Sequence, residues 1–286
     1  MKDRRDRSTS DTTIPNVLTI AGTDPSGGAG IQADLKAFSA LGAYGMSVVT
    51  ALVAQNTQGV DRILEIPADF VAAQIDTLFA DVAVDAVKIG MVNTAEVAST
   101  IVDRLRRYRP SVVVLDPVMV AKSGDKLLTP DAVAVMRDEL VPLATVITPN
   151  LPEAAVLTGR EAPTTIEEMH DAVRSLHQLG PRSVLLKGGH LDDESSTDLL
   201  FDGTTVMELR ADRIRTANSH GTGCTLSAAI AALAPQRDSL ARAVEEAKEY
   251  LTGALRHSDE LDVGHGHGPT HHFYALWKTS REEARR

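Results

Sequence analysis

Cysteine, aromatic residues and long apolar runs are all scarce in this sequence. Its single cysteine, Cys224, excludes a disulfide framework within the chain. No apolar run approaches the roughly 20 residues that a membrane-spanning helix needs. Residues 1–13 are charged and lack the apolar stretch of a secretory signal. We therefore expect a solvated tail over residues 1–14 and a protein of the cytoplasm.

Basic residues are also outnumbered, because 39 Asp and Glu face 29 Lys and Arg, which gives a net charge of −10. A surface this acidic repels nucleic acid and anionic membranes, so we expect neither as a partner. ATP is an anion as well. A nucleotide site in this chain must therefore depend on local hydrogen-bond donors and a metal ion rather than on overall charge.

Short apolar segments alternate with segments of helical periodicity along the chain. The apolar runs predict buried strands at residues 17–21, 47–53, 86–89, 112–115, 146–147 and 184–186. One-sided apolar stripes predict helices at residues 29–41, 70–79, 93–108, 225–233 and 240–255, with others starting near residues 130, 152 and 166. A β-hairpin is expected around Asp202 and Gly203. This alternation indicates an α/β fold with a mostly parallel sheet, and we expect a single domain over residues 15–280.

Ligands of such sheets bind beyond the carboxyl ends of the strands, where a glycine-rich segment, residues 22–30 (GTDPSGGAG), lies. Its four glycines indicate that another group approaches the backbone closely. No Gly-Lys-Ser/Thr follows, so it is not a Walker A loop, nor is it the dinucleotide fingerprint. A strained turn is the alternative. Asp34 follows about one helical turn later, and at the mouth of a pocket it could accept a hydrogen bond from a substrate hydroxyl.

Oxygen ligands gather after two neighbouring predicted strands. Asn150 and Glu153 follow the strand at residues 146–147, and Asp116 follows the strand at residues 112–115. Mg²⁺ prefers a few such ligands, completed by waters and phosphates. Asp116 and Glu153 are therefore candidate metal ligands, with Glu153 acting through a metal-bound water. The structural alternative is that Asn150 simply caps the next helix.

Two further segments could hold phosphate groups. Residues 218–225 (NSHGTGCT) open a helix, whose free N–H groups and dipole favour an anion such as a transferring phosphoryl group. A plain glycine-rich cap is the alternative. Cys224 lies in the first turn, where we expect its thiol pKa to fall, unless it is only a small buried apolar side chain. Lys187 ends the strand at residues 184–186 and can reach a nucleotide phosphate as a point charge, unless it merely belongs to a turn.

Residues 264–272 (GHGHGPTHH) contain four histidines. The segment has no cysteine nearby and no helical His-x-x-x-His spacing, so we do not expect a metal site there. A loop that packs near the active site or against a partner subunit is the better interpretation.

In their order along the chain, these segments resemble the hydroxymethylpyrimidine/phosphomethylpyrimidine kinase family of the ribokinase superfamily. The resemblance covers about residues 15–278, and it rests on motifs at residues 21–36, 88–91, 116–119, 122–125, 148–154, 187–190 and 220–225. It implies a ribokinase-like three-layer αβα sandwich that works as a homodimer. It also implies two transfers from ATP with Mg²⁺. The first goes to the alcohol of 4-amino-5-hydroxymethyl-2-methylpyrimidine, and the second goes to the resulting phosphate.

The resemblance also implies roles for individual residues. It places the pyrimidine near Gly22, Asp34, Val53, Gln55 and Met91, and ATP near Asn150, Lys187 and Thr222. It makes Asp116 and Glu153 the metal ligands, and it forms an anion hole from Gly221, Thr222, Gly223 and Cys224. The carboxamide of Gln55 suits the edge of an aminopyrimidine, since it offers one donor and one acceptor. A Cys224 thiolate could remove the alcohol proton, so we expect it to matter more in the first transfer than in the second.

Two other functions are compatible with parts of the pattern. A pyridoxal or pyridoxine kinase of the same fold also phosphorylates a ring hydroxymethyl group, but the glycine-rich segment with Asp34 and Gln55 favours the pyrimidine. The other is a non-catalytic nucleotide-binding regulator, and the residues that argue against it are Asn150, Glu153, Lys187 and Cys224.

Overall fold

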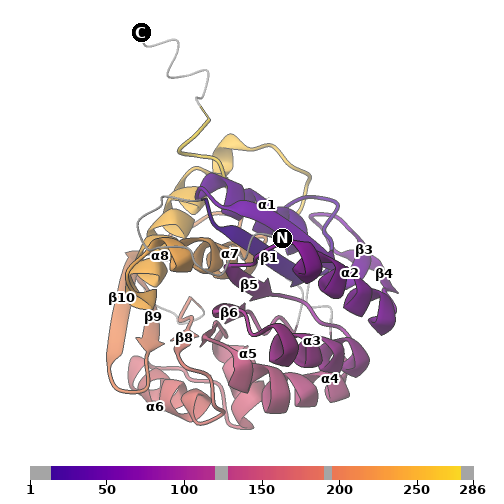
Figure 1. Ribbon diagram of the computed structural model, residues 1–286. Coiled ribbons are helices and arrows are strands. Elements are labelled where there is room, and N and C mark those ends of the chain that lie inside the picture. Colours follow the sequence, from indigo (N-terminus) through magenta and orange to yellow (C-terminus); the bar gives the residue numbers. More distant parts are fainter. Residues whose placement is uncertain (1–13, 120–127, 190–194, 278–286) are drawn as a thin grey trace.

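The computed structural model describes residues 14–119, 128–189 and 195–277, and an eight-stranded sheet runs through it (Figure 1). The strand order is β10-β9-β8-β7-β6-β5-β1-β2. All neighbours from β8 to β2 are parallel, whereas β9 and β10 are antiparallel. The mostly parallel sheet predicted from the sequence is thus confirmed. The strands are β1 (Asn16–Ala21), β2 (Tyr44–Val49), β5 (Ala86–Ile89), β6 (Val112–Leu115), β7 (Val146–Ile147), β8 (Val184–Leu186), β9 (Ser195–Phe201) and β10 (Val206–Asp212).

Helices cover both faces of the sheet (Figure 1). One layer contains α1 (Gly30–Ala40), α7 (Thr222–Leu233) and α8 (Leu240–Arg256). The other contains α2 (Ala68–Asp81), α3 (Ala95–Tyr108), α4 (Pro130–Val135), α5 (Leu151–Thr158) and α6 (Ile166–His177). Short π and 3-10 turns follow at Met136–Leu140, Val141–Leu143, Ala234–Gln236 and Ser258–Glu260. Within the described residues, no helix has both the length and the apolar character needed to cross a membrane.

The side chains of β1 alternate between two cores, one on each face of the sheet. Leu18 and Ile20 pack beneath α2 and α3, whereas Val17 packs beneath α1 and α7. The second core is rich in alanine, and α7 is buried from Thr225 to Leu233. Small side chains let α7 lie close against the sheet. The first turn of α7 lies at the carboxyl ends of the strands.

The predicted strand at residues 47–53 is in fact two strands that belong to different sheets. β2 ends at Val49, and β3 (Ala51–Gln55) pairs with β4 (Val60–Glu65) as a separate two-stranded sheet. The chain changes direction at Thr50, whose backbone N–H donates to Ala21 O and whose hydroxyl donates to Met91 O, at 3.0 and 2.9 Å. The prediction was wrong because an unbroken β-branched run does not record which partner each residue pairs with.

The hairpin predicted around Asp202 and Gly203 is confirmed by the pairing of β9 with β10. Asp202 Oδ1 accepts hydrogen bonds from the backbone N–H groups of Thr204 and Thr205, at 2.8 and 2.7 Å. Gly203 has a φ of +95°, which an L residue rarely adopts. The predicted tail at residues 1–13, the motif at residues 122–125 and His190 lie outside the described residues.

Candidate active site

A cavity of about 810 Å³ opens at the carboxyl ends of the parallel strands. All but one of the predicted site residues line it, although they come from distant parts of the chain. The exception is Asp34. Those on the wall are Gly22, Val53, Gln55, Met91, Asp116, Asn150, Glu153, Lys187, Gly221, Thr222, Gly223 and Cys224. The fold therefore brings them to one place, while their individual roles remain predictions.

The residues predicted to hold the pyrimidine gather at one end of this cavity. Gly22 follows β1 and Met91 follows β5, and a Cβ atom on Gly22 would lie 2.6 Å from Cε of Met91. Val53 and Gln55 come from β3, which the Gly22 segment holds in place. Thr23 Oγ1 accepts a hydrogen bond from Val53 N at 2.9 Å. We call this group, Gly22, Val53, Gln55 and Met91, the acceptor cluster.

Asp34 does not belong to the acceptor cluster, and the expectation that it lies at a pocket mouth is wrong. Its side chain is fully buried on α1. Its carboxylate accepts hydrogen bonds from Lys88 Nζ at 2.8 and 3.0 Å and from Thr19 Oγ1 at 2.6 Å. Both partners lie on strands beneath the helix, so Asp34 points into the sheet rather than into the cavity.

The two glycine-rich segments of the sequence pack directly against each other. Gly221 is the N-cap of α7 with a φ of +77°, and a Cβ atom there would overlap the carbonyl of Gly28. His220 Nε2 lies 2.8 Å from Oδ2 of Asp24. Asp24 is fully buried, and it also accepts the backbone N–H of Ala29 at 2.7 Å. The close backbone approach inferred from the glycines is therefore confirmed, and it presents the first turn of α7 to the cavity.

Cys224 is a partly exposed free cysteine in that first turn. Burial raises the pKa of its thiol to about 11, although the charge of Lys88 lowers it, and the charges of Asp34 and Asp116 raise it further. The predicted fall in this pKa is therefore wrong. A helix N-terminus favours the thiolate, but desolvation and two nearby carboxylates outweigh it.

Asn150 and Glu153 form a complete capping box at the start of α5. Asn150 Oδ1 accepts from Glu153 N, and Glu153 Oε2 accepts from Asn150 N, both at 2.8 Å. The structural alternative for Asn150 is thus present in the fold, although both residues also line the cavity. Burial raises the pKa of the Glu153 carboxyl to about 7, with Lys187 opposing and Asp116 adding to the shift.

Asp116 and Lys187 meet close to the first turn of α7. Asp116 Oδ1 accepts from Lys187 Nζ at 3.1 Å, and Asp116 Oδ2 accepts from Ser227 Oγ at 3.2 Å. A Cβ atom on Gly223 would lie 3.3 Å from Lys187 Nζ and 3.5 Å from Asp116 Oδ2. This end of the cavity therefore combines a cation, a carboxylate and helix N–H groups.

The two carboxylates fit a magnesium site of the open kind. Among the residues that the structure describes, no group of three or more His, Cys, Asp or Glu could hold a metal ion. Asp116 and Glu153 nevertheless both face the cavity. Two carboxylates suit Mg²⁺, because it keeps several waters and takes further ligands from substrate phosphates.

Sequence reasoning missed two buried ion pairs whose lysines line the cavity. Lys88 pairs with Asp34, as described above. On the other side, Lys248 Nζ of α8 donates to Asp198 Oδ2 of β9 at 2.7 Å, and Asp198 Oδ1 accepts Gly188 N at 2.9 Å. A lysine inside the buried strand at residues 86–89 was a visible signal for the first pair. No local pattern marks the second, because its partners are far apart in the sequence.

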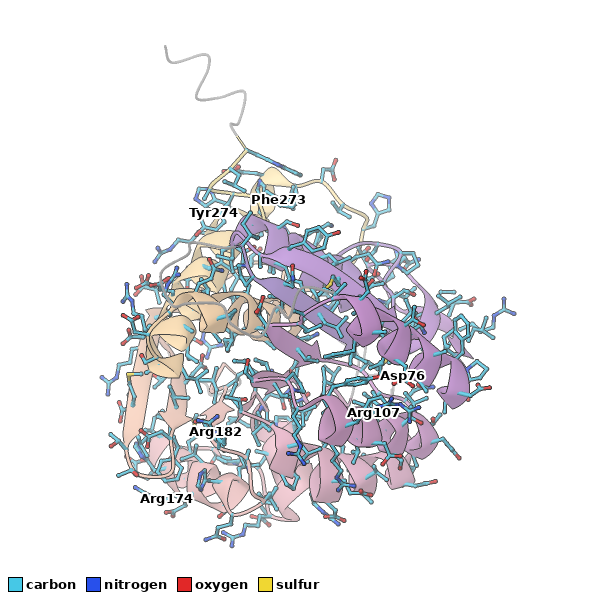
Figure 2. The ribbon with its side chains drawn as sticks, in the orientation of Figure 1. Asp76, Arg107, Arg174, Arg182, Phe273 and Tyr274 are labelled. Carbon is cyan, nitrogen blue, oxygen red and sulfur yellow. The ribbon has the colours of Figure 1, made fainter. Side chains whose placement is uncertain are left out.

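The histidine-rich segment packs against the site, as expected. His220 N donates to Gly268 O at 3.0 Å, and His267 N donates to Thr57 O, between β3 and β4, at 2.8 Å. His272 Nε2 lies 3.0 Å from Oγ1 of Thr225 on α7. Figure 2 shows Phe273 and Tyr274 beyond this segment, beside α1 and α8. The alternative role at a partner subunit stays a prediction.

Comparisons with known proteins agree with this arrangement. A family model described as phosphomethylpyrimidine kinase matches residues 24–271. The hydroxymethylpyrimidine/phosphomethylpyrimidine kinase of Escherichia coli K12 is 58% identical over 262 residues, which are 92% of this chain and 98% of that protein. Phosphomethylpyrimidine kinase from Clostridium difficile 630 is 44% identical, with a TM-score of 0.76 over 84% of this chain and 99% of that one. Pyridoxal kinase from Bacillus subtilis, solved as an ADP complex, is 38% identical, with a TM-score of 0.86 over 93% of this chain and 100% of that one.

Proposed function

This chain belongs to the phosphomethylpyrimidine kinase family, and we propose that it transfers phosphoryl groups from ATP to a hydroxymethylpyrimidine in two steps. The first step phosphorylates the alcohol of 4-amino-5-hydroxymethyl-2-methylpyrimidine, and the second phosphorylates the product. The observation that carries the proposal is the single cavity, in which the acceptor cluster and the Asp116–Lys187 end meet at the first turn of α7.

In each transfer, an acceptor oxygen forms a bond to the γ-phosphorus while the bond to the bridging oxygen of ADP breaks. Negative charge spreads over the three equatorial oxygens, so catalysis depends on positioning and charge stabilisation. The backbone N–H groups of Thr222 and Gly223 at the start of α7 suit these oxygens. Lys187 lies beside them and supplies a positive charge for the nucleotide phosphates.

Asp116 and Glu153 are the residues that would hold Mg²⁺ with ATP. The bound ion would neutralise charge on the phosphate oxygens of the nucleotide. Asp116 is held by Thr148 Oγ1 at 3.1 Å as well as by Lys187 and Ser227. These bonds fix its carboxylate at the edge of the sheet before any ligand arrives.

Cys224 lies in the same turn of α7 and lines the cavity, so the proposal places it beside the transferring group. Its thiol pKa of about 11 leaves it protonated at neutral pH, so its resting role is that of a neutral neighbour to the phosphoryl group. Only the small thiolate fraction can accept the alcohol proton in the first transfer. The second transfer needs no base, because the phosphate acceptor is already ionised.

The experiment that tests the function gives the purified protein Mg-ATP with either the hydroxymethylpyrimidine or pyridoxal, and follows the products by mass spectrometry. Sequential mono- and diphosphates of the pyrimidine are the expected result. The fold match to pyridoxal kinase makes pyridoxal the second candidate acceptor. Phosphorylation of pyridoxal alone, or a pyrimidine that stops at the monophosphate, would assign the protein to that activity instead.

A homodimer is part of the proposal, and exposed apolar side chains around the small sheet support it. Leu52 on β3 and Leu64 on β4 are register partners that are 45% and 61% exposed. Tyr44 and Phe70 are exposed on the neighbouring β2 and α2. Light scattering of the wild type should give the mass of two chains, and Leu52→Lys with Leu64→Lys should give one. Leu276→Lys, at another exposed leucine, is the control that should leave the dimer intact.

A further inference from the structure

Lys88 is a charged side chain in a core where most of its neighbours are apolar. It lies on β5, fully buried, on the sheet face that α1 and α7 cover. Thr19 on β1 is its register partner, so both side chains point to this face. The Lys88 ammonium bonds both carboxylate oxygens of Asp34, and the Thr19 hydroxyl bonds the same carboxylate.

Stability does not explain why the chain places an ion pair here. Removing two charges from water is costly, and well-packed apolar residues of similar volume often stabilise a fold as well or better. Buried charges with perturbed titration gather instead at functional sites. The charge of Asp34 raises the pKa of Lys88 against the opposing effect of burial, so the ammonium stays charged.

Lys88 also reaches the part of the cavity where the acceptor binds. It lines the cavity wall, and a Cβ atom on Gly90 would lie 2.7 Å from its Nζ and 3.0 Å from Cβ of Ala21. Ala21 and Gly90 immediately precede Gly22 and Met91 of the acceptor cluster. The ammonium therefore lies beneath the acceptor end of the cavity, whereas Lys187 projects from the Asp116 end.

We propose that Lys88 is a positioning residue for phosphoryl transfer, which turns the positive end of its ion pair with Asp34 towards the acceptor side of the cavity and is held there by Asp34 and Thr19. It lies on the sheet face that α7 covers, and it acts through the N–H groups in the first turn of that helix, which serve both transfers. The inference rests on the proposed kinase function and deepens it. Because this charge is matched to the transition state rather than to either bound substrate, its loss should lower kcat and leave both KM values unchanged.

The experiment replaces the whole pair, since removing one partner alone strands a buried charge and destabilises the fold. Lys88→Met with Asp34→Leu gives an apolar pair. Lys88→Gln with Asp34→Asn gives a neutral pair that keeps hydrogen bonds. The control is Arg104→Met with Asp76→Leu, which removes an ion pair between α2 and α3 whose residues do not line the cavity. Circular dichroism and thermal melting first establish which variants fold.

In both folded double variants, kcat should fall by about 10- to 100-fold in each transfer, less than the loss expected on removing a direct oxyanion donor. KM for ATP and for the pyrimidine should stay within twofold of the wild type, and the control should keep its kcat. A double variant that folds and keeps wild-type kcat would overturn the inference. So would failure of both double variants to fold, because the pair would then be a folding device. Absence of turnover in the wild type would instead contradict the kinase function itself.

Discussion

Lys248→Met should weaken the binding of ATP more than that of the pyrimidine. The substitution removes an ammonium that bonds Asp198 Oδ2 at 2.7 Å and Ser196 O at 2.8 Å. Asp198 is only 6% exposed, and it also holds the backbone N–H of Gly188, next to Lys187. Loss of its cation should therefore loosen the loop from which Lys187 reaches the nucleotide phosphates.

The expected magnitudes follow from the burial of this pair. Stranding a buried carboxylate costs about 3–5 kcal/mol. At about 2 °C per kcal/mol for a chain of this size, Tm should fall by about 6–10 °C. We expect KM for ATP to rise about tenfold, which corresponds to about 1.4 kcal/mol. KM for the pyrimidine should stay near its wild-type value, because the acceptor cluster lies on the other side of α7.

Steady-state kinetics with each substrate varied in turn, together with thermal melting, test this prediction. Arg242→Met is the matched control, since it removes an exposed cation with glutamate partners from the same helix. Such surface pairs contribute about 1 kcal/mol or less, so this variant should melt and turn over like the wild type. Equal increases in both KM values, or an unchanged Tm for Lys248→Met, would refute the reasoning.

Three further predictions concern the first turn of α7 and the carboxylates. Cys224→Ala should reduce the rate of the first transfer more than that of the second. In the wild type, the rate of the first transfer should rise with pH towards about 11 as the thiolate forms. Comparable losses in both transfers, measured separately by mass spectrometry, would contradict the role of a base. Burial raises the pKa of Glu153 from 4.5 to about 7, so the fold loses stability as pH rises through this window. Glu153→Gln should therefore raise Tm at about pH 8 and change it little at about pH 4, and a uniform shift would argue against this cause. Gly221→Ala should abolish both transfers. The new Cβ would displace the carbonyl of Gly28, and the φ of +77° at this position disfavours alanine. Retained turnover in the same assay would show that the loop tolerates the strain.

Periodicity was sufficient for most strands of the main sheet. The strands at residues 86–89 and 112–115 were predicted with the bounds that the structure has, because a short apolar run between glycine, proline or charged residues leaves little choice. Helix starts were harder. The helix predicted at residues 93–108 includes Asn93, a residue that could cap it, but α3 begins at Ala95, Thr94 accepts the hydrogen bond from Val97 N, and Asn93 is buried. Two adjacent residues can both cap a helix, and only tertiary packing selects between them.

The candidate site was predictable where chemistry follows a strand end. Asp116 and Lys187 could be placed together because the carboxyl ends of parallel strands share one edge of the sheet. Asp34 was misplaced because a position on a helix does not reveal whether a side chain turns to solvent, to a ligand or to a partner on the sheet. The pKa of Cys224 was misjudged for a related reason. The effect of a helix terminus is visible in sequence, whereas the desolvation that outweighs it depends on packing.

Positive and negative side chains nearly balance on the cavity wall. Among the described residues that line the cavity, four are lysine or arginine and four are aspartate or glutamate. Three of the basic residues are lysines held by aspartates, at 2.8, 3.1 and 2.7 Å. The wall therefore has almost no net positive charge with which to neutralise the phosphates of ATP. The lysines and arginine on the wall are Lys88, Lys187, Lys248 and Arg213, and the acidic residues are Asp116, Glu153, Asp198 and Asp212.

A divalent ion must then bring the missing positive charge, so nucleotide binding and metal binding should be coupled. Calorimetric titration of the protein with ATP should show tight binding with Mg²⁺ and binding at least tenfold weaker in EDTA. Asp116→Asn should reduce this difference, since it removes a carboxylate expected to hold the ion. Equal affinity for ATP with and without the metal would mean that the lysines alone balance the nucleotide, and that their pairing with aspartates is broken when ATP binds.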